Sequence, residues 1–431
     1  MPGRRLRYGS VTVEMAPMTL MLDERPAPRL SAARLRAQPV IDWLVEVARR
    51  IDEAPEFLEA VCERIAAEGV PLERCTVHAR TLHPEIFGFT VRWLPDRSTE
   101  MIPHYHGAST EAAYENSAVY WLFGGAERFR RRIGRAGVVL DFSILPELKA
   151  DGFTDYVAVR LPFADGTSSA MTLATKSPDG FGDEDIGFFD ALLAHLALVL
   201  EARVGHRIAE NVLKTYLGDD AGRRVLRGEV TRGSGQVIEA AILFADIRGF
   251  TELSETLPGD QVIQLLNSYF ESVIHPVEGH GGQVLKLIGD GVLAIFPLGR
   301  GGAKPACFAA ATAANAAFAN LAEVNRARAA AGARTIRIGI TLHVGPVIYG
   351  NIGASSRLDF TVIGRAVNLV SRLQRLCRRF GKAMVFSAEF VRQSGIPALS
   401  LGRHEVRGVG EPQEVFALLP AEDPYFQTES G

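Results

Sequence analysis

The sequence has few cysteines, no long uncharged apolar run and no excess of basic residues. Its four cysteines are widely spaced and include no C-x-x-C pair, which favours single buried thiols in a reduced cytoplasm. No apolar run of about 18 residues is free of charge, so we expect no membrane span. The formal net charge of −3 argues against nucleic acid as the main partner.

The length of 431 residues predicts two or three domains, because one ordinary domain is shorter. Residues 1–38 mix Pro, Arg and Ala without periodicity, which predicts a flexible segment. A first domain is then expected at 39–202, a helical linker at 203–235 and a second domain at 236–420. Residues 421–431 are expected to form a tail.

The first domain is predicted to combine helices with strands. Apolar residues recur at helical spacing from Ile41 to Ala67, with a break near Pro55. Strand-like runs follow it, and they are Thr76–Leu82, Phe87–Trp93, Gly137–Phe142, Tyr156–Pro162 and Ala170–Ala174. This pattern predicts a sheet with helices packed on it.

Two polar patterns in the first domain allow more than one interpretation. His104 and His106 stand two residues apart and could hold a metal or haem. Since no third ligand stands nearby, their pattern favours a hydrogen-bonded or surface role. The basic run 128–132 could contact anions, and its charge favours a solvated helix face.

A long helix is predicted over residues 183–217, with Asp183 and Glu184 near its positive end. Its apolar residues recur at steps of three or four, and they are Phe189, Leu193, Leu196, Leu200, Val204 and Ile208. Such a stripe can pair two protomers or cover a sheet. Both interpretations hold if the first half packs on the sheet and the second half pairs protomers.

The second domain alternates strands with helices in the order β-α-α-β-β-α-β, which indicates an α/β or α+β sandwich. Asp246 ends an apolar run, and Asp290 follows Gly289 at the end of another β-type stretch. Paired carboxylates at strand ends suit magnesium held against a nucleoside triphosphate. Taken singly, each aspartate is also compatible with a turn or helix-cap residue.

Three segments of the second domain resemble the catalytic domain of class III adenylate and guanylate cyclases. They are Phe244–Thr251, Lys286–Gly291 and Thr361–Arg372, in this order along the chain. The resemblance covers about 237–420, including the terminal stretch 407–418. It implies an α+β fold, a ferredoxin-like α/β sandwich, for the second domain.

The resemblance implies that Asp246 and Asp290 hold two divalent cations, Mg²⁺ or Mn²⁺, in each active site. The segment that follows Asp246 would present backbone N–H groups to the phosphates at a helix start. The residues expected to do so are Ile247, Gly249, Phe250 and Thr251.

The same resemblance assigns Lys286 and Thr361 to purine recognition. Guanylate cyclases of the family usually carry Glu and Cys at these two positions, so Lys with Thr favours ATP. Thr361 alone could be an ordinary strand residue, and the ATP assignment therefore depends mostly on Lys286. Asn368 would orient the ribose, and Arg372 would neutralise charge on the α-phosphate, although both could also be solvated helix residues.

In this family the metal residues and the purine residues meet across two protomers, so the resemblance implies a homodimer with two equivalent sites. Residues 39–202 resemble, more distantly, a GAF sensor domain of α/β type, which implies a small-molecule regulator. We therefore expect an enzyme that converts ATP to 3′,5′-cyclic AMP and pyrophosphate.

Two alternatives remain at this point, a guanylate cyclase and a catalytically silent scaffold with the same fold. A scaffold would have lost a metal aspartate or the transition-state arginine, and both kinds of residue are present in the sequence. A diguanylate cyclase is disfavoured, because no Gly-Gly-Asp/Glu-Glu-Phe motif occurs.

Overall fold

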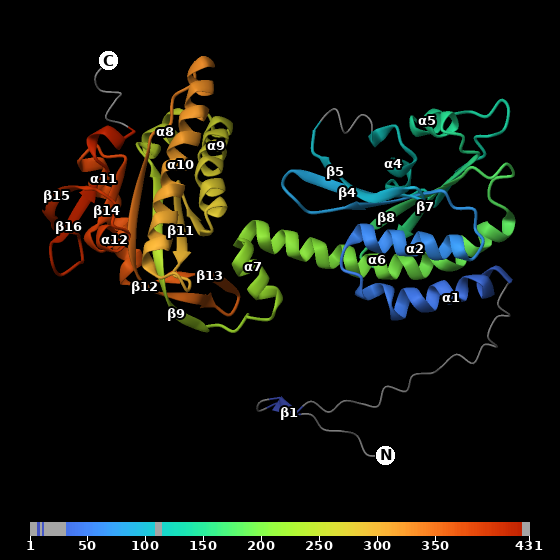
Figure 1. Ribbon diagram of the computed structural model, residues 1–431, viewed down its shortest axis with the longest axis horizontal. Coiled ribbons are helices and arrows are strands. Elements are labelled where there is room, and N and C mark those ends of the chain that lie inside the picture. The colour runs from blue at the N-terminus through green and yellow to red at the C-terminus, as the bar shows by residue number, and fades with distance from the viewer. Residues whose placement is uncertain (1–6, 9–10, 13–31, 108–113, 425–431) are drawn as a thin grey trace. The chain divides into compact units, whose positions relative to one another are not determined.

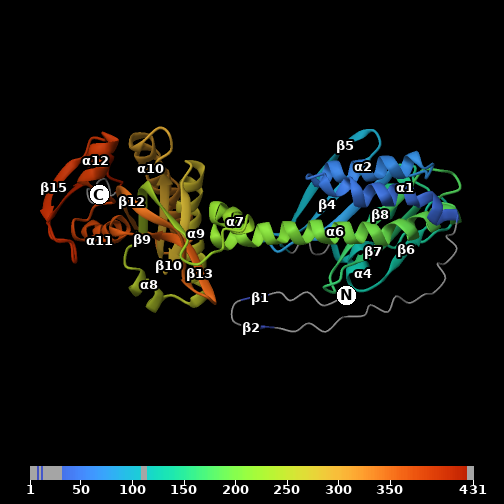
Figure 2. The same ribbon diagram turned by 90° about the horizontal axis from the view of Figure 1, so that it is seen from below.

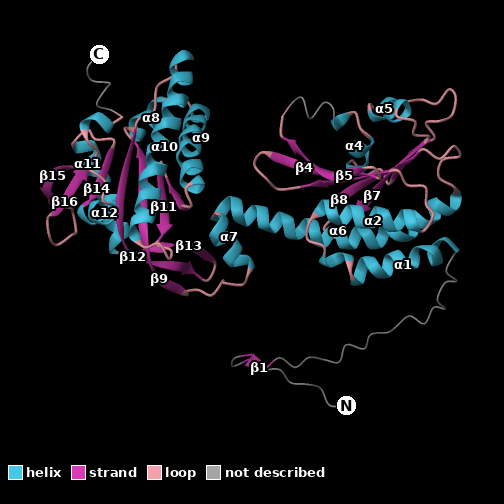
Figure 3. Cartoon of the chain, in the orientation of Figure 1, coloured by secondary structure: helices cyan, strands magenta, loops and turns pink. Residues whose placement is uncertain are grey.

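A computed structural model describes residues 7–8, 11–12, 32–107 and 114–424 (Figure 1). The chain divides into two compact units, Met1–Val204 and Gly205–Gly431. Both are mixed α/β structures, as the colouring by secondary structure shows (Figure 3). Within the described ranges, no helix has both the length and the apolar character needed to cross a membrane.

The ends of the chain differ in part from the prediction. Most of the segment 1–38 and residues 425–431 of the tail lie outside the described residues, apart from the two short strands β1 (Arg7–Tyr8) and β2 (Val11–Thr12). Helix α1 begins at Ala32, and Ala37 is fully buried, so the folded part starts before residue 39. Asp423 is also buried and pairs with Lys382, so the chain stays packed into the predicted tail.

The first unit contains an antiparallel sheet whose described strands follow the order β5-β4-β3-β8-β7-β6. These strands are β3 (Arg74–Arg80), β4 (Ile86–Leu94), β5 (Arg97–Tyr105), β6 (Arg128–Arg131), β7 (Asp155–Pro162) and β8 (Ser168–Thr175). The helices are α1 (Ala32–Glu46), η1 (Ala48–Arg50), α2 (Ala54–Ala67), α4 (Ala118–Phe123), α5 (Ile144–Ala150) and α6 (Asp183–Leu217).

Helices cover both faces of this sheet, with α1, α2 and α6 on one side and α4 and α5 on the other (Figures 1 and 2). The alternation of side chains along the strands produces this arrangement. On β8, Met171 and Leu173 pack in the core beneath α1, α2 and α6, whereas Ala170 and Ala174 pack in the core of α4 and α5.

Two predictions for residues 128–142 are wrong. Gly137–Phe142 forms no strand; Phe142 is buried, with its ring centroid 4.7 Å from that of Phe129. The basic run forms strand β6 instead of a helix face. Arg130 of β6 donates to the fully buried Asp155 at 2.7 Å, an ion pair between distant positions that charge counting along the sequence does not reveal.

Helix α6 has the predicted bounds, and its first half covers the sheet. Phe189, Leu193, Leu196 and Leu200 are buried in the core of the first unit. Val204 and Ile208 are only partly buried, so the pairing of protomers by the second half stays a prediction.

The second unit is built on a sheet of described strands in the order β10-β11-β9-β12-β14-β16-β15, with β13 paired to β12. The strands are β9 (Gly235–Ile247), β10 (Gln283–Ile288), β11 (Gly291–Pro297), β12 (Ile338–Ala354), β13 (Arg357–Ile363), β14 (Met384–Ser387), β15 (Leu399–His404) and β16 (Gln413–Ala417). The helices are α7 (Asp219–Leu226), α8 (Phe250–Thr256), α9 (Gly259–Gly279), α10 (Ala303–Ala330), α11 (Arg365–Arg379), α12 (Ala388–Ser394) and η2 (Pro420–Glu422).

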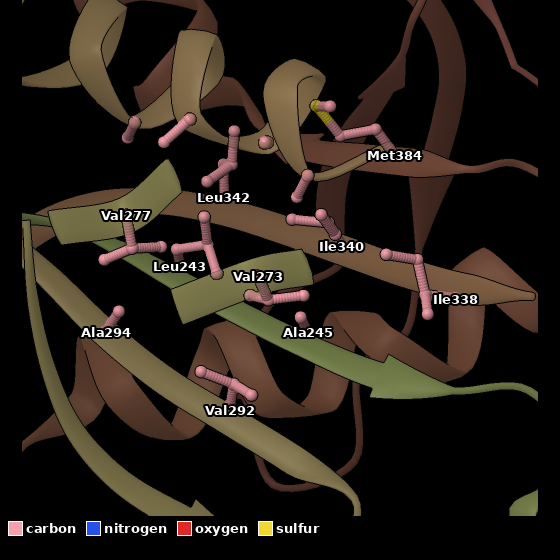
Figure 4. Packing of buried hydrophobic residues seen from close by; sticks show 14 of the residues in the cluster. Leu243, Ala245, Val273, Val277, Val292, Ala294, Ile338, Ile340, Leu342 and Met384 are labelled. Carbon is pink, nitrogen blue, oxygen red and sulfur yellow. The ribbon is translucent and has the colours of Figure 1, made fainter. Parts of the chain in front are cut away.

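Strand β9 lies between β11 and β12 and is buried on both faces. Leu243 and Ala245 face the core formed with α9 and α10, whereas Ala240 and Ile242 face α7 and α11. Figure 4 shows the first of these cores at close range, where side chains of β9, β11, β12 and α9 interlock. Burial on both faces explains why the sequence of this strand is a continuous apolar run.

Candidate active site

Asp246 and Asp290 lie together at one end of the sheet. Asp246 is the penultimate residue of β9, and Asp290 occupies the tight turn that joins β10 to β11. Gly289, with φ at +62°, allows this turn. The Ile247 N–H donates to Asp290 Oδ2 at 3.2 Å, which fixes the turn against the end of β9. The predicted carboxylate pair is therefore formed within one protomer.

Arg378 of α11 contacts the same carboxylate pair. Its Nη2 donates to Oδ1 and Oδ2 of Asp246 at 2.9 and 2.8 Å. Burial raises the pKa of Asp246, with a further contribution from the neighbouring Asp290, while Arg378 acts in the opposite direction. Asp246 and Asp290 thus concentrate negative charge, which attracts the guanidinium of Arg378.

These residues fit a divalent cation. Carboxylate oxygens are the ligands that Mg²⁺ prefers, and the guanidinium of Arg378 shows that a cation is accommodated beside Asp246. No group of three or more His, Cys, Asp or Glu side chains with metal-binding geometry occurs in the described ranges. Mg²⁺ is commonly coordinated by only one or two protein carboxylates, and water and phosphate oxygens supply its remaining ligands. Two carboxylates are therefore enough for this ion.

The segment after Asp246 turns through Gly249, whose φ of +70° caps helix α8. Phe250 and Thr251 form the first turn of α8, where backbone N–H groups have no partner within the helix. The Ile247 N–H bonds Asp290 in this structure, so the predicted phosphate contact from Ile247 would have to share or replace that bond and stays a prediction. The phosphate contacts of Gly249, Phe250 and Thr251 stay predictions as well.

Lys286 and Thr361 lie on the neighbouring strands β10 and β13. The Lys286 Nζ donates to Asp359 Oδ2 at 2.6 Å, which ties β10 to β13. Because side chains alternate along a strand, Asp359 and Thr361 share one face of β13. The structure therefore places Lys286 beside Asp359, on the face of β13 that also carries Thr361, whose side chain is buried.

Asn368 and Arg372 lie one turn apart on α11 and line a cavity of about 840 Å³. An added Cβ at Gly408 would lie 3.0 Å from Arg372 Nη1, and the φ of +71° at Gly408 also favours glycine, so the loop passes close to the guanidinium. His343 lies in the wall of the cavity, where burial lowers its pKa to about 4 and its Nδ1 bonds Ser387 Oγ at 2.8 Å. The cavity therefore contains a neutral imidazole at physiological pH.

The predicted residues do not all line one cavity of the protomer. Asp246, Asp290, Lys286 and Thr361 are not among the residues that line the cavity of Asn368 and Arg372. Helix geometry accounts for part of this separation, because Arg378 lies about 9 Å further along α11 and about 240° around it from Arg372. One face of α11 thus serves the cavity and another reaches Asp246.

Among the described residues, His104 and His106 belong to no cluster of three or more side chains that could hold a metal. His104 Nε2 bonds Thr90 Oγ1 at 2.6 Å, which confirms the hydrogen-bonded interpretation for this residue. His106 follows β5 and is exposed, with its ring centroid 6.0 Å from that of Phe87.

Sequence reasoning missed Asp359 and Arg378. Asp359 could have been found, because it stands two residues before Thr361 in a strand pattern and hence on the same face. Arg378 carries no such signal. It is one of several arginines near the end of α11, and only the fold directs it to a residue 132 positions earlier.

Comparison with protein families matches residues 234–418 to the adenylate and guanylate cyclase catalytic domain. Residues 234–418 are a class III cyclase catalytic domain. The adenylate cyclase of Anabaena cylindrica is 33% identical over 165 residues, which are 38% of this chain and 32% of that protein. Adenylate cyclase 1 of Rhizobium meliloti is 27% identical over 216 residues, 50% of this chain and 31% of that protein. The chain thus spans about a third of these curated relatives.

Solved cyclase structures are similar to the same region. The adenylyl cyclase CyaB of P. aeruginosa is 30% identical, with a TM-score of 0.40, over 43% of this chain and 96% of that one. The guanylyl cyclase Cya2 is 28% identical, with a TM-score of 0.38, over 42% of this chain and 92% of that one. Their names include an adenylyl and a guanylyl cyclase.

Proposed function

We propose that the protein is an adenylate cyclase that converts ATP to 3′,5′-cyclic AMP and pyrophosphate. The observation that supports the proposal is the place of Lys286 in a cyclase domain, where it bonds Asp359, two residues before Thr361 on the same face of β13. An ammonium donates to a ring acceptor of adenine, and a threonine hydroxyl accepts from its exocyclic amine. Both groups suit adenine at once.

In the proposed reaction the ribose 3′-oxygen attacks the α-phosphorus and loses its proton to solvent. A new oxygen–phosphorus bond forms while the bond from the α-phosphorus to the β-bridging oxygen breaks. Pyrophosphate leaves with the electron pair of that bond. Such transfers depend on positioning and charge stabilisation more than on covalent help from the protein.

The chain's own residues divide this work. Asn368 would orient the ribose, and Arg372 would stabilise the charge that develops on the α-phosphate. Asp246 and Asp290 would hold two Mg²⁺ or Mn²⁺ ions, whose chemistry when bound is to acidify the 3′-hydroxyl and neutralise the triphosphate. Gly249, Phe250 and Thr251 would bond phosphate oxygens through their N–H groups.

We further propose that the active form is a homodimer with two shared sites. The separation of Asp246 from the cavity of Arg372 supports this, because one protomer leaves its groups apart. An exposed apolar row gives independent support. Val237 and Ile363 both lie opposite Ile348 in register, and these residues are 73%, 45% and 45% exposed. A second copy would cover this row.

The first unit is proposed to be a GAF-like sensor that binds a small-molecule regulator. Its antiparallel sheet with helices on both faces is compatible with this assignment. A route to the cyclase domain exists through α7, since Ala221 of this helix packs with Phe360 and Val362 of β13. These two residues flank Thr361, so a shift of α7 would move the purine surface. The proposed fold of the second unit remains the ferredoxin-like sandwich.

The test is a product assay on the purified full chain with Mg²⁺ or Mn²⁺, given ATP and GTP separately. We expect cyclic AMP from ATP in clear excess over cyclic GMP from GTP, and no product from an Asp290→Asn control. Equal or greater cyclic GMP would identify a guanylate cyclase. No cyclic product from a dimeric sample would favour a scaffold.

A further inference from the structure

Tyr269 of α9 is fully buried, and its hydroxyl has no hydrogen-bond partner among the described residues. Its ring belongs to the hydrophobic core beneath the sheet, where the ring of a phenylalanine would fill the same space. A buried hydroxyl without a partner destabilises the folded state, because folding removes its hydrogen bonds to water. Packing therefore explains the ring of Tyr269 and leaves its hydroxyl unexplained.

The core side chains of α9 and β11 lie in successive layers. Figure 4 shows Val277 of α9 near Ala294 of β11. It also shows Val273, four residues earlier on α9, near Val292, two residues earlier on β11. Four helical residues and two strand residues span similar lengths, about 6 and about 6.6 Å, so the layers stay in step. The next four residues back along α9 lead to Tyr269.

Both aspartates stand at this next layer. Asp290 precedes Val292 by two residues, and its Oδ2 accepts from the Ile247 N–H at 3.2 Å. Asp246 immediately precedes Ile247, whose side chain belongs to the same core as Tyr269. Burial raises the pKa of Tyr269, and the negative charges of Asp246 and Asp290 raise it further. The hydroxyl therefore lies within reach of both charges and stays protonated, so it can donate.

The carboxylate pair can accept a further donor. When ionised, two carboxylates have about eight lone-pair sites. Arg378 bonds both oxygens of Asp246, and the Ile247 N–H bonds Asp290 Oδ2. Carboxylates that ligate a cation are commonly held in orientation by hydrogen bonds from neighbouring groups. A phenol hydroxyl suits this task because it is neutral, whereas the charged guanidinium of Arg378 competes with the cation.

We propose that Tyr269 is a positioning residue of the divalent-cation site, whose hydroxyl hydrogen-bonds the carboxylate pair of Asp246 and Asp290 when the cation is bound. The inference rests on the proposed function, because it takes these two aspartates as the cation ligands. The choice between ATP and GTP does not enter it. Tyr269 acts through the aspartates and is distinct from the residues that would contact the nucleotide.

The test compares Tyr269→Phe with the wild-type full-length protein. Calorimetric titration of Mn²⁺ without nucleotide should show an affinity lowered by about tenfold. Urea unfolding of the metal-free proteins should show unchanged or higher stability in the variant, because it loses an unpaired hydroxyl and keeps the ring. With ATP, the Mn²⁺ concentration for half-maximal activity should rise, while kcat at saturating Mn²⁺ stays within about twofold.

Tyr349→Phe is the matched control. The Tyr349 hydroxyl donates to Asp220 Oδ2 at 2.8 Å, so its removal should lower stability and leave Mn²⁺ affinity unchanged. Asp290→Asn sets the level of Mn²⁺ binding elsewhere on the protein. Equal Mn²⁺ affinity in wild type and Tyr269→Phe would overturn the inference. A loss of affinity accompanied by a loss of metal-free stability would show a structural role and overturn it as well.

Failure of the proposed function gives a different result. Wild-type protein that binds no more Mn²⁺ than Asp290→Asn would overturn the cation site itself, and the inference with it. Wild-type protein that binds Mn²⁺ at this site but makes no cyclic AMP would overturn the proposed function only, because the comparison of Mn²⁺ affinities needs no turnover.

Discussion

In the sheet of the first unit, buried polar side chains form hydrogen bonds to one another. Thr172 and Thr76 bond at 2.6 Å, Thr76 bonds His78 at 2.8 Å, His78 bonds Thr90 at 2.8 Å, and Thr90 bonds His104 at 2.6 Å. Burial lowers the pKa of His78 to about 3, so its imidazole is neutral and bonded at both nitrogens. This network is satisfied, and it has little capacity left for a ligand.

The cyclase domain differs, because its polar side chains keep hydrogen-bonding capacity while they remain accessible, with Lys286 42% and Asp246 16% exposed. Lys286 keeps protons to donate, and Asp246 with Asp290 keeps more carboxylate oxygens than their protein partners use. The difference teaches that residue type alone does not mark a site. Unused hydrogen-bonding and charge capacity at an accessible position does.

The largest effect on activity is expected at the residues of the cyclase domain that have unused hydrogen-bonding or charge capacity. Arg372→Ala should lower kcat about 10²- to 10³-fold, which corresponds to about 2.7–4 kcal/mol of lost transition-state stabilisation. The expected change is in kcat more than in KM, because the guanidinium acts on charge that develops during the reaction. Steady-state kinetics with ATP measure this. A loss confined to KM would show that Arg372 binds ground-state ATP only, and Arg326→Ala serves as the exposed arginine control.

A smaller effect is expected in the buried network. Thr90→Val should leave nitrogens of His78 and His104 without their partner and destabilise the first unit by about 1–3 kcal/mol. Tryptophan fluorescence during urea unfolding reports this unit, since all three tryptophans lie at positions 43, 93 and 121.

Thr99→Val is the matched control for that experiment. The Thr99 hydroxyl is buried and has no hydrogen-bond partner among the described residues, so its removal should be neutral or slightly stabilising. If both variants lose the same stability, the network does not stabilise the unit as argued.

The pH dependence of the first unit should follow from His78. Its pKa is about 3 in the folded protein and near 6.5 when unfolded, so between these values the unfolded chain binds a proton that the folded chain does not. Stability therefore falls as the pH falls below about 6.5, by about 1 kcal/mol between pH 7 and pH 5.5. Unfolding of wild type and His78→Gln at both pH values isolates this contribution. The same pH response in both proteins would contradict it.

The smallest effect is expected from Arg378→Ala. Arg378 and a divalent cation use the same Asp246 oxygens, so removing the guanidinium should strengthen Mn²⁺ binding. An ion pair with an exposed partner is worth at most about 1 kcal/mol, which sets the gain at about fivefold or less. Calorimetric titration of Mn²⁺ without nucleotide measures it. Unchanged or weaker binding in the variant would show that Arg378 does not compete with the metal.

Several elements of the fold and part of the candidate site could be predicted from local sequence patterns. The bounds of α6 follow from its acidic start and its apolar stripe, and the paired aspartates follow from strand ends next to glycines. Partners distant in sequence could not be predicted. The contacts of Arg130 with Asp155 and of Arg378 with Asp246 arise only when the sheet and its helices are assembled.

The central claim is that the groups with unused capacity form a complete site only when two protomers meet. Mixing Asp246→Ala with Arg372→Ala protein, each inactive alone, tests it most directly. After subunit exchange the account predicts that cyclic AMP production returns, because each heterodimer contains one site with all its residues intact. Confirmed subunit exchange without any recovery of activity would contradict the shared site.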